Sequence, residues 1–195
     1  MRPIVLYVGI AFALNLAATL SSVYRNSLPS SLQNNNILYN LNSMARVILF
    51  GWYILSLKLI RSSWLPKTVL PVYFIFLLIN FIFLESPLFL SSRLLSAESI
   101  VMLVLCLFFF MRSMQDDSDI NWLKHPSFLV CIGISLYEAI NFFIFLFFYP
   151  LLQSNLEFGM LTMKIFSISY IILCILIALA LRRNFKQQNV HDKSN

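Results

Sequence analysis

Three polar side chains share one face of a long apolar segment in this 195-residue chain. Ser135, Glu138 and Asn141 follow one another at intervals of three residues, so a helix places them on one side, with Tyr137 flanking that face. A carboxylate inside a membrane span costs several kcal/mol unless it is paired, hydrated or protonated. Glu138 is therefore the residue whose type and setting most strongly predict a binding or proton-exchange site.

Other apolar segments supply polar partners at a similar depth. Asn15 and Asn80 lie inside two of these segments, Arg46 begins a third, and Lys164 lies near the start of the last. Arg46 and Lys164 are the candidate counter-charges for Glu138. Together these positions predict a polar ligand pocket, whose candidate residues are Ser135, Tyr137, Glu138, Asn141, Asn80, Asn15 and Arg46.

Some of these polar residues also have a purely structural explanation. Intramembrane Asn side chains often join helices through hydrogen bonds worth about 0.6–2 kcal/mol each, which is the favoured role for Asn15 and Asn80. For Glu85, Glu98 and Lys164, a position at the membrane interface is the simpler interpretation. Glu138 is harder to explain by packing, and both a functional and a structural role stay open for it.

The sequence lacks the residue patterns of metal, redox and hydrolytic chemistry. Its cysteines fall inside apolar segments without a CxxC pair, so packing is the expected role of Cys106, Cys131 and Cys174. His125 and His191 form no HExxH pair, and the sequence contains neither a P-loop nor a Gly-x-Ser-x-Gly elbow. We therefore expect no cofactor, no metal ion and no catalytic set.

Composition places the chain in a membrane. Hydrophobic residues make up 59% of it and charged residues only 11%, with a mean hydropathy of +0.81, whereas a soluble domain is about a quarter charged. The apolar runs lack the strict alternation of β-barrel strands, so helices are expected. The predicted fold is all-α, a polytopic six-transmembrane-helix bundle with spans near 4–22, 44–60, 68–84, 95–111, 127–149 and 160–181.

Two local patterns refine this layout. Polar residues between positions 39 and 46 recur at helical spacing, which indicates that the second helix begins before its apolar run and has one polar face. In the first helix, Gly9, Ala13 and Ala17 lie four residues apart and predict a close helix–helix contact. The expected organisation is one transmembrane domain over 1–181 and a short polar cytoplasmic tail over 182–195.

Positive charge orients the predicted bundle. Ten of the 14 Lys and Arg residues lie on the side that holds both termini, and four lie on the other side. By the positive-inside rule, the N- and C-termini are expected in the cytoplasm. The polar groups then gather from mid-membrane toward the outer face, with Glu138 near the floor of an outward-opening pocket. The net charge of +6 reflects this topology and does not indicate nucleic-acid binding.

One segment resembles a known group of proteins. Residues 121–128, Asn-Trp-Leu-Lys-His-Pro-Ser-Phe, precede an apolar helix with an internal Tyr137 and a Phe-rich end at 142–148. This pattern resembles small bacterial multi-helix membrane proteins that are similar to the membrane sensor regions of histidine kinases and stand without a kinase domain. The resemblance implies a sensor-associated protein of the bacterial inner membrane with a separate cytoplasmic signalling partner, such as a histidine kinase. The chain departs from the pattern at Glu138, where the resembling proteins have a small residue.

Three functions are compatible with these features. A non-enzymatic membrane module that senses a ligand or docks a partner fits the missing catalytic sets and the polar stripe, and we favour it. A small proton-coupled transporter would use Glu138 as its ionisable site, although four glycines in the whole chain are few for broken, rocking helices. An intramembrane lipid-modifying enzyme would use Glu85, Glu98 or Glu138 as acid or base. A homo-oligomer is compatible with all three.

Overall fold

The computed structural model describes residues 1–24, 35–57, 60, 64–84, 91–116, 122–154 and 156–192. Within these ranges every regular element is helical, which confirms the predicted all-α fold. The elements are α1 (Arg2–Val23), α2 (Asn36–Ser56), α4 (Leu65–Ile79), the π-helical turn η3 (Asn80–Leu84), α5 (Ser92–Met114), the short 3₁₀-helix η4 (Trp122–Lys124), α6 (Pro126–Ser154) and α7 (Leu156–Asp192).

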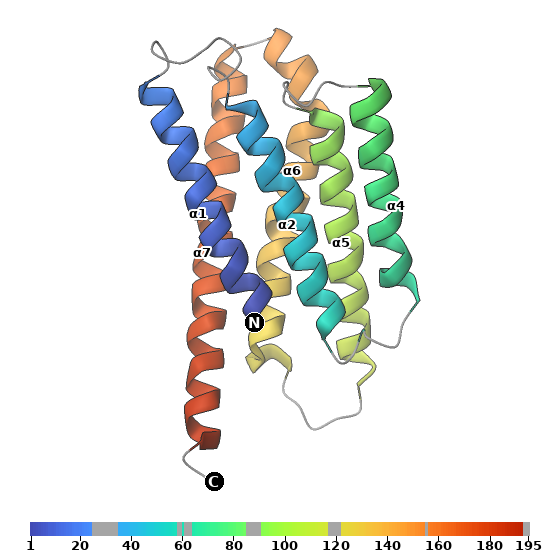
Figure 1. Ribbon diagram of the computed structural model, residues 1–195, viewed down its shortest axis with the longest axis vertical. Helices are drawn as coiled ribbons and strands as arrows, with labels where there is room; N and C mark the ends of the chain where they lie inside the picture. Colours follow the sequence, from blue (N-terminus) through green and yellow to red (C-terminus); the bar gives the residue numbers. More distant parts are fainter. Residues whose placement is uncertain are drawn as a thin grey trace.

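The α-helices run side by side as an up-and-down bundle in which consecutive helices point in opposite directions (Figure 1). Helix α6 packs against both α5 and α7, α2 packs against α1 and α5, and α4 packs against α5. The N-terminal end of α1 and the C-terminal end of α7 lie at the same end of the bundle (Figure 1). The starts of α2, α5 and α7 therefore lie at the opposite end.

Four of the described helical segments are long and apolar enough to cross a membrane: Arg2–Val23, Arg93–Met114, Pro126–Leu146 and Glu157–Gln187. A fifth apolar helix, Lys67–Phe83, is shorter. Helix α2 is absent from both groups because its first half carries polar residues that lower its hydropathy. The chain thus has the helices of a membrane protein, while the full count of six spans stays a prediction.

The bundle buries polar side chains and exposes large apolar ones, which is the arrangement expected of a protein surrounded by lipid. Phe12 is 70% exposed and Phe83 is 76% exposed, whereas Arg46, Glu98 and Glu138 are each at most 3% exposed. Lipid chains can cover the outer apolar surface, but they offer no partner to an ionised group. The charged side chains must therefore find their partners inside the bundle.

Proline and serine residues mark where several helices begin. Pro3 and Pro66 lie in the first turns of α1 and α4, and Pro126 begins α6, positions at which the missing N–H of proline removes no intrahelical hydrogen bond. The hydroxyl of Ser91 accepts a hydrogen bond from the backbone N–H three residues later and caps α5. This cap fixes the start of α5 and places Glu98 in its second turn.

The start of α2 and the end of α7 can be compared with the boundaries predicted from the sequence. Helix α2 begins at Asn36, well before its apolar run, as the spacing of its polar residues predicts. Helix α7 continues to Asp192, through most of the segment expected as a polar tail. Neither Gly nor Pro occurs between 160 and 192, so nothing in the sequence breaks the helix there. The end of the predicted tail, 193–195, lies outside the described residues.

The small residues of α1 make only part of the contact expected of them. A Cβ added at Gly9 would meet no atom within 4 Å. The prediction that another helix of this chain packs closely against Gly9 is therefore wrong. Helix α1 instead buries Ala11 and Ala18, and it packs against α2. Close glycine contacts lie on two other helices. A Cβ at Gly133 on α6 would be 3.2 Å from atoms of Leu173 and Leu176 on α7, and a Cβ at Gly51 on α2 would be 2.9 Å from the Leu70 side chain on α4.

Because Gly133 is in close contact and Gly9 is not, we expect a valine to destabilise the protein at position 133 but not at position 9. Gly133→Val forces α6 and α7 apart, and we expect it to lower the free energy of unfolding by about 1–3 kcal/mol. Gly9→Val adds the same side chain where space is open and should leave stability nearly unchanged. Thermal unfolding of both variants in the same detergent measures the difference, and equal melting temperatures would contradict the α6–α7 contact.

Candidate functional site

Arg46 on α2 lies between two carboxylates from other helices. Its Nε donates a hydrogen bond to Glu98 Oε1 on α5 and lies 3.3 Å from Glu138 Oε1 on α6. The three side chains are at most 4% exposed. We call these three residues the ion cluster. Of the two predicted counter-charges, Arg46 is the one that pairs with Glu138, whereas Lys164 is exposed on α7.

Two serines complete the coordination of the carboxylates. The Ser43 hydroxyl, one turn before Arg46 on α2, donates to Glu98 Oε2. The Ser99 hydroxyl on α5 lies 2.8 Å from Glu138 Oε2. Hydrogen bonds to charged groups are stronger than neutral ones, so each carboxylate gains a partner besides the guanidinium. The ion cluster and its serines therefore tie α2, α5 and α6 together at one depth of the bundle.

The charges of the ion cluster do not balance when both carboxylates are ionised. Among the described residues, the ionisable groups that act electrostatically on Glu138 are Arg46 and Glu98. One guanidinium then faces two carboxylates, which leaves one net negative charge in surroundings that solvate charge poorly. A proton on one carboxylate, or a further cation, would neutralise the cluster.

The guanidinium also stacks on an aromatic ring. Arg46 Cζ lies 4.7 Å from the centre of the Tyr137 ring, a distance at which a cation is attracted to the ring face. Tyr137 in turn contacts Phe166 and Tyr170 on α7, with ring centres 5.9 and 5.8 Å away. Tyr137 thereby connects the ion cluster to α7.

Asn141 lies one turn after Glu138 and is completely buried. It adjoins both Glu138 and Tyr137. Neither polar atom of its carboxamide makes a hydrogen bond of standard geometry with any residue in the described part of the chain. Of the predicted stripe of Ser135, Glu138 and Asn141, the last two lie together beside the flanking Tyr137. Glu138 and Tyr137 both contact Arg46.

The other three predicted site residues lie apart from the ion cluster. The Ser135 hydroxyl donates to the Cys131 carbonyl of its own helix. Asn80 is buried, and its Nδ2 donates to the Ser91 hydroxyl at 3.2 Å, which joins the end of α4 to the start of α5. Asn15 donates to the Ala11 carbonyl at 2.8 Å. Asn80 thus has the interhelical role expected of it, whereas Asn15 bonds within its own helix.

The sequence named Glu98 only as a possible acid or base of a lipid-modifying enzyme and left it out of the candidate ligand-pocket residues. Its apolar run begins only a few residues before Glu98, so a position at the membrane interface was expected. In the structure the side chain is completely buried and bonded to Ser43 and Arg46. The spacing of Ser43 and Arg46 on one face of α2 was a visible signal, but it did not reveal which acid they would meet. Glu85, the other acid expected at the interface, lies outside the described residues.

A pocket of about 300 Å³ adjoins the ion cluster, and Arg46 and Tyr137 form part of its wall. We call it the Arg46 pocket. Its polar lining comes mainly from the first turns of α2 and its apolar lining from α5, α6 and α7. Among the described residues, the lining comprises Asn36, Tyr39, Asn42, Arg46, Leu95, Tyr137, Phe145, Met163, Phe166 and Ser167. These residues lie toward the end of the bundle opposite the two chain ends, where the sequence predicts an outward-opening pocket.

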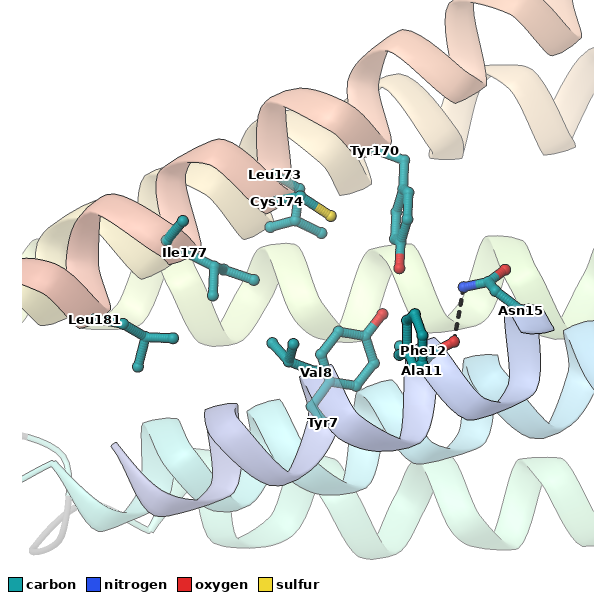
Figure 2. A pocket seen from close by; sticks show the side chains of 11 residues that line it. Tyr7, Val8, Ala11, Phe12, Asn15, Tyr170, Leu173, Cys174, Ile177 and Leu181 are labelled. Atoms are coloured by element: carbon teal, nitrogen blue, oxygen red, sulfur yellow. Dashed lines mark hydrogen bonds between the residues drawn. The ribbon is translucent and has the colours of Figure 1, made fainter.

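A second cavity, of about 330 Å³, lies between α1 and α7 (Figure 2). Figure 2 shows the hydroxyls of Tyr7 and Tyr170 pointing toward each other across this largely apolar groove, with Asn15 nearby. Tyr170 lines the groove and Tyr137 lines the Arg46 pocket, and the two rings contact each other edge to face between these cavities. Helix α1 thus closes the bundle only loosely on the α7 side.

Comparison with protein families, with curated proteins and with solved structures finds no match to this chain. A functional assignment therefore depends on the geometry of the site itself. Among the residues that the structure describes, no group of three or more His, Cys, Asp or Glu side chains could hold a metal ion. The groups that could bind a ligand or exchange a proton are a buried guanidinium, two carboxylates, amides and hydroxyls beside a largely apolar pocket.

Loss of the guanidinium should be the most damaging single change in the ion cluster. Arg46→Gln leaves two buried carboxylates without a counter-charge, and we expect it to cost about 3–5 kcal/mol of stability. Glu138→Gln keeps the shape and a polar contact with Ser99 while leaving Arg46 paired with Glu98, so its cost should be near 1 kcal/mol, roughly that of one hydrogen bond.

Chemical unfolding in matched micelles, followed by tryptophan fluorescence, compares the two variants. The exposed carboxylate at the start of α7 offers a control, because Glu157→Gln changes the same group away from the cluster. Equal stability of Arg46→Gln and Glu138→Gln would show that the ion cluster is not the element that holds α2, α5 and α6 together.

Proposed function

We propose that this chain is a non-enzymatic, multi-pass protein of the bacterial inner membrane that binds a small ligand in the Arg46 pocket and reports its presence to a cytoplasmic partner. The observation that carries the proposal is the double role of Arg46. The same side chain forms part of the pocket wall and holds the ion cluster that joins α2, α5 and α6. A ligand that contacts Arg46 must therefore alter the contact between these helices.

The packing of the bundle offers a route from the pocket to the cytoplasm. Glu138 and Tyr137 lie on α6, and Tyr137 contacts two aromatic side chains of α7. Helix α7 continues beyond its apolar part to Asp192, and this extension carries Arg182, Arg183 and Lys186. A shift of α6 relative to α7 would move this basic helical extension, on which a separate signalling protein such as a histidine kinase could dock.

The proposed orientation has both termini in the cytoplasm. Both chain ends lie at one end of the bundle and the Arg46 pocket toward the other, so a pocket that opens outward follows from the same orientation that the positive charges favour. The proposal includes six spans, with α2 crossing the membrane by turning its polar face inward toward α5 and α6.

A small proton-coupled transporter is the second candidate. The observation that favours it is the excess of one carboxylate in the ion cluster, which a proton would neutralise. Uptake into sealed vesicles under an imposed pH gradient distinguishes a transporter from a sensor, because a sensor moves no substrate. The third idea, a lipid-modifying enzyme, has less support, since Glu98 is bound to Arg46 and Ser43 instead of facing a substrate.

If the Arg46 pocket opens to the outside of the cell, a cysteine in the pocket should be accessible to a thiol reagent that cannot cross the membrane. In a Cys174→Ser background, Asn42→Cys should react with a membrane-impermeant thiol reagent applied to intact cells. Lys186→Cys, on the proposed cytoplasmic extension, should react only after the cells are opened. Mass spectrometry of the purified protein reads out both positions. The reverse pattern would invert the proposed topology.

The signalling role predicts a phenotype that is separate from folding. A strain that lacks the chain is complemented with the wild type, with Glu138→Gln or with the control Glu157→Gln, and transcripts are profiled by RNA sequencing. We expect Glu138→Gln to insert at the wild-type level and yet change the transcript profile, because it weakens one side of the ion cluster. A profile identical to that of the wild type would contradict a sensor that works through Glu138.

A further inference from the structure

We propose that the ligand of the Arg46 pocket is a small apolar molecule that carries a carboxylate, and that Glu138 takes up one proton when this molecule binds. This inference rests on the proposed ligand-binding function and names the chemical class of the ligand. The ligand carboxylate replaces Glu138 as the second counter-charge of Arg46, the proton comes from solvent, and the net charge of the site stays constant.

The guanidinium is the group that makes a carboxylate the fitting ligand. Arg46 is the charged residue among the described residues that line the pocket, and Glu98 and Glu138 are not part of this lining. Its contacts to both carboxylates run through Nε, and a guanidinium carries four further N–H donors on its terminal amino groups. Two of these donors match the two oxygens of a carboxylate. An amine entering the pocket would meet the positive group first.

The two protein carboxylates differ in how firmly they hold Arg46. Glu98 accepts a hydrogen bond from Arg46 Nε and another from Ser43. Glu138 Oε1 lies 3.3 Å from the same Nε, and this oxygen makes no hydrogen bond of standard geometry with any described residue. Glu138 is therefore the partner that an incoming carboxylate displaces.

A protonated Glu138 could donate a hydrogen bond to a neighbouring side chain without changing its position. The Ser99 hydroxyl lies 2.8 Å from its Oε2, and a hydroxyl can accept as well as donate. The Asn141 carboxamide adjoins Glu138, and its oxygen makes no hydrogen bond of standard geometry with the described residues. A neutral carboxyl group turned toward Asn141 would give this buried oxygen a donor.

The groups that face Glu138 leave no other described site for this proton. In the described part of the chain, the other ionisable side chains around the ion cluster are tyrosines, which are neutral at physiological pH. Besides Arg46 on α2 and Glu98 on α5, each packed helix contributes one tyrosine: Tyr7 on α1, Tyr73 on α4, Tyr137 on α6 and Tyr170 on α7. Since Glu98 keeps both of its hydrogen bonds, the exchange of partners falls to Glu138.

The remaining walls of the pocket set the size of the molecule. Leu95, Phe145, Met163 and Phe166 surround the space beside Arg46 with apolar and aromatic surface. Its volume of about 300 Å³ is at the small end of ligand pockets. One aromatic ring on a short chain, or a medium-length alkyl chain, fits this volume. A phospholipid does not.

Three probes of equal shape and different end group test the inference. The full chain in lipid nanodiscs is titrated by calorimetry with 4-phenylbutyrate, 4-phenylbutanol and 4-phenylbutylamine, and empty nanodiscs correct for partition into lipid. We expect 4-phenylbutyrate to bind about tenfold or more tightly than the other two. Repeating the titration in phosphate and in Tris, which differ in ionisation enthalpy, should show an uptake of close to one proton per bound acid.

Two variants separate the roles of the charged groups. Glu138→Gln should bind 4-phenylbutyrate at least as tightly as the wild type and take up no proton, because Arg46 has already lost its looser partner. Glu157→Gln, the matched control, should behave as the wild type does. Gel filtration of each variant in nanodiscs confirms that it has folded, and the wild-type titration tests the inference even if Glu138→Gln fails to fold.

Each of the other possible results of these titrations refutes one part of the inference. Tighter binding of the alcohol or the amine would refute the carboxylate class while leaving a ligand pocket in place. Acid binding without proton uptake by the wild type, or with unchanged uptake by Glu138→Gln, would refute the exchange at Glu138. If none of the three probes binds, the inference fails as a whole, whereas the sensor function is still decided by the transcript profile of Glu138→Gln.

Discussion

A guanidinium enclosed by an apolar bundle has to be matched by acceptors at its own depth, and this requirement organises the protein. Arg46 on α2 is buried, and lipid offers it no acceptor. Glu98 from α5 and Glu138 from α6 meet it, each with a serine as a further partner. Because removal of Arg46 would leave both carboxylates without a counter-charge, the guanidinium is the group that holds these three helices together.

The same constraint explains the distribution of side chains over the bundle. Large apolar residues such as Phe12 face outward, and the charged residues Arg46, Glu98 and Glu138 face one another inside the bundle. Tyr137 on α6 and Tyr170 on α7 meet edge to face, and they lie between the Arg46 pocket and the groove that α1 and α7 form. The ion cluster thus adjoins the Arg46 pocket directly through Arg46.

Several features of the fold could be predicted because they depend on neighbouring residues along the chain. Apolar runs of sufficient length predict helices wherever the chain is in lipid, and α1, α5 and α6 begin and end close to the predicted spans. The early start of α2 followed from polar residues at helical spacing. The close contact expected at Gly9 did not form, since a small residue permits a close approach without supplying the neighbour that makes it.

The sequence by itself determined that the chain is helical, that it is rich in membrane-type helices, and that Ser135, Glu138 and Asn141 share one helix face with Tyr137 flanking it. Only the tertiary structure decided that Arg46 and not Lys164 meets Glu138, and that Glu98 belongs to the same cluster. The physical reason is that periodicity fixes which side chains share a face of one helix. Which faces then meet depends on how all the helices pack, because residues 46, 98 and 138 become neighbours only when three helices lie side by side at matching depth.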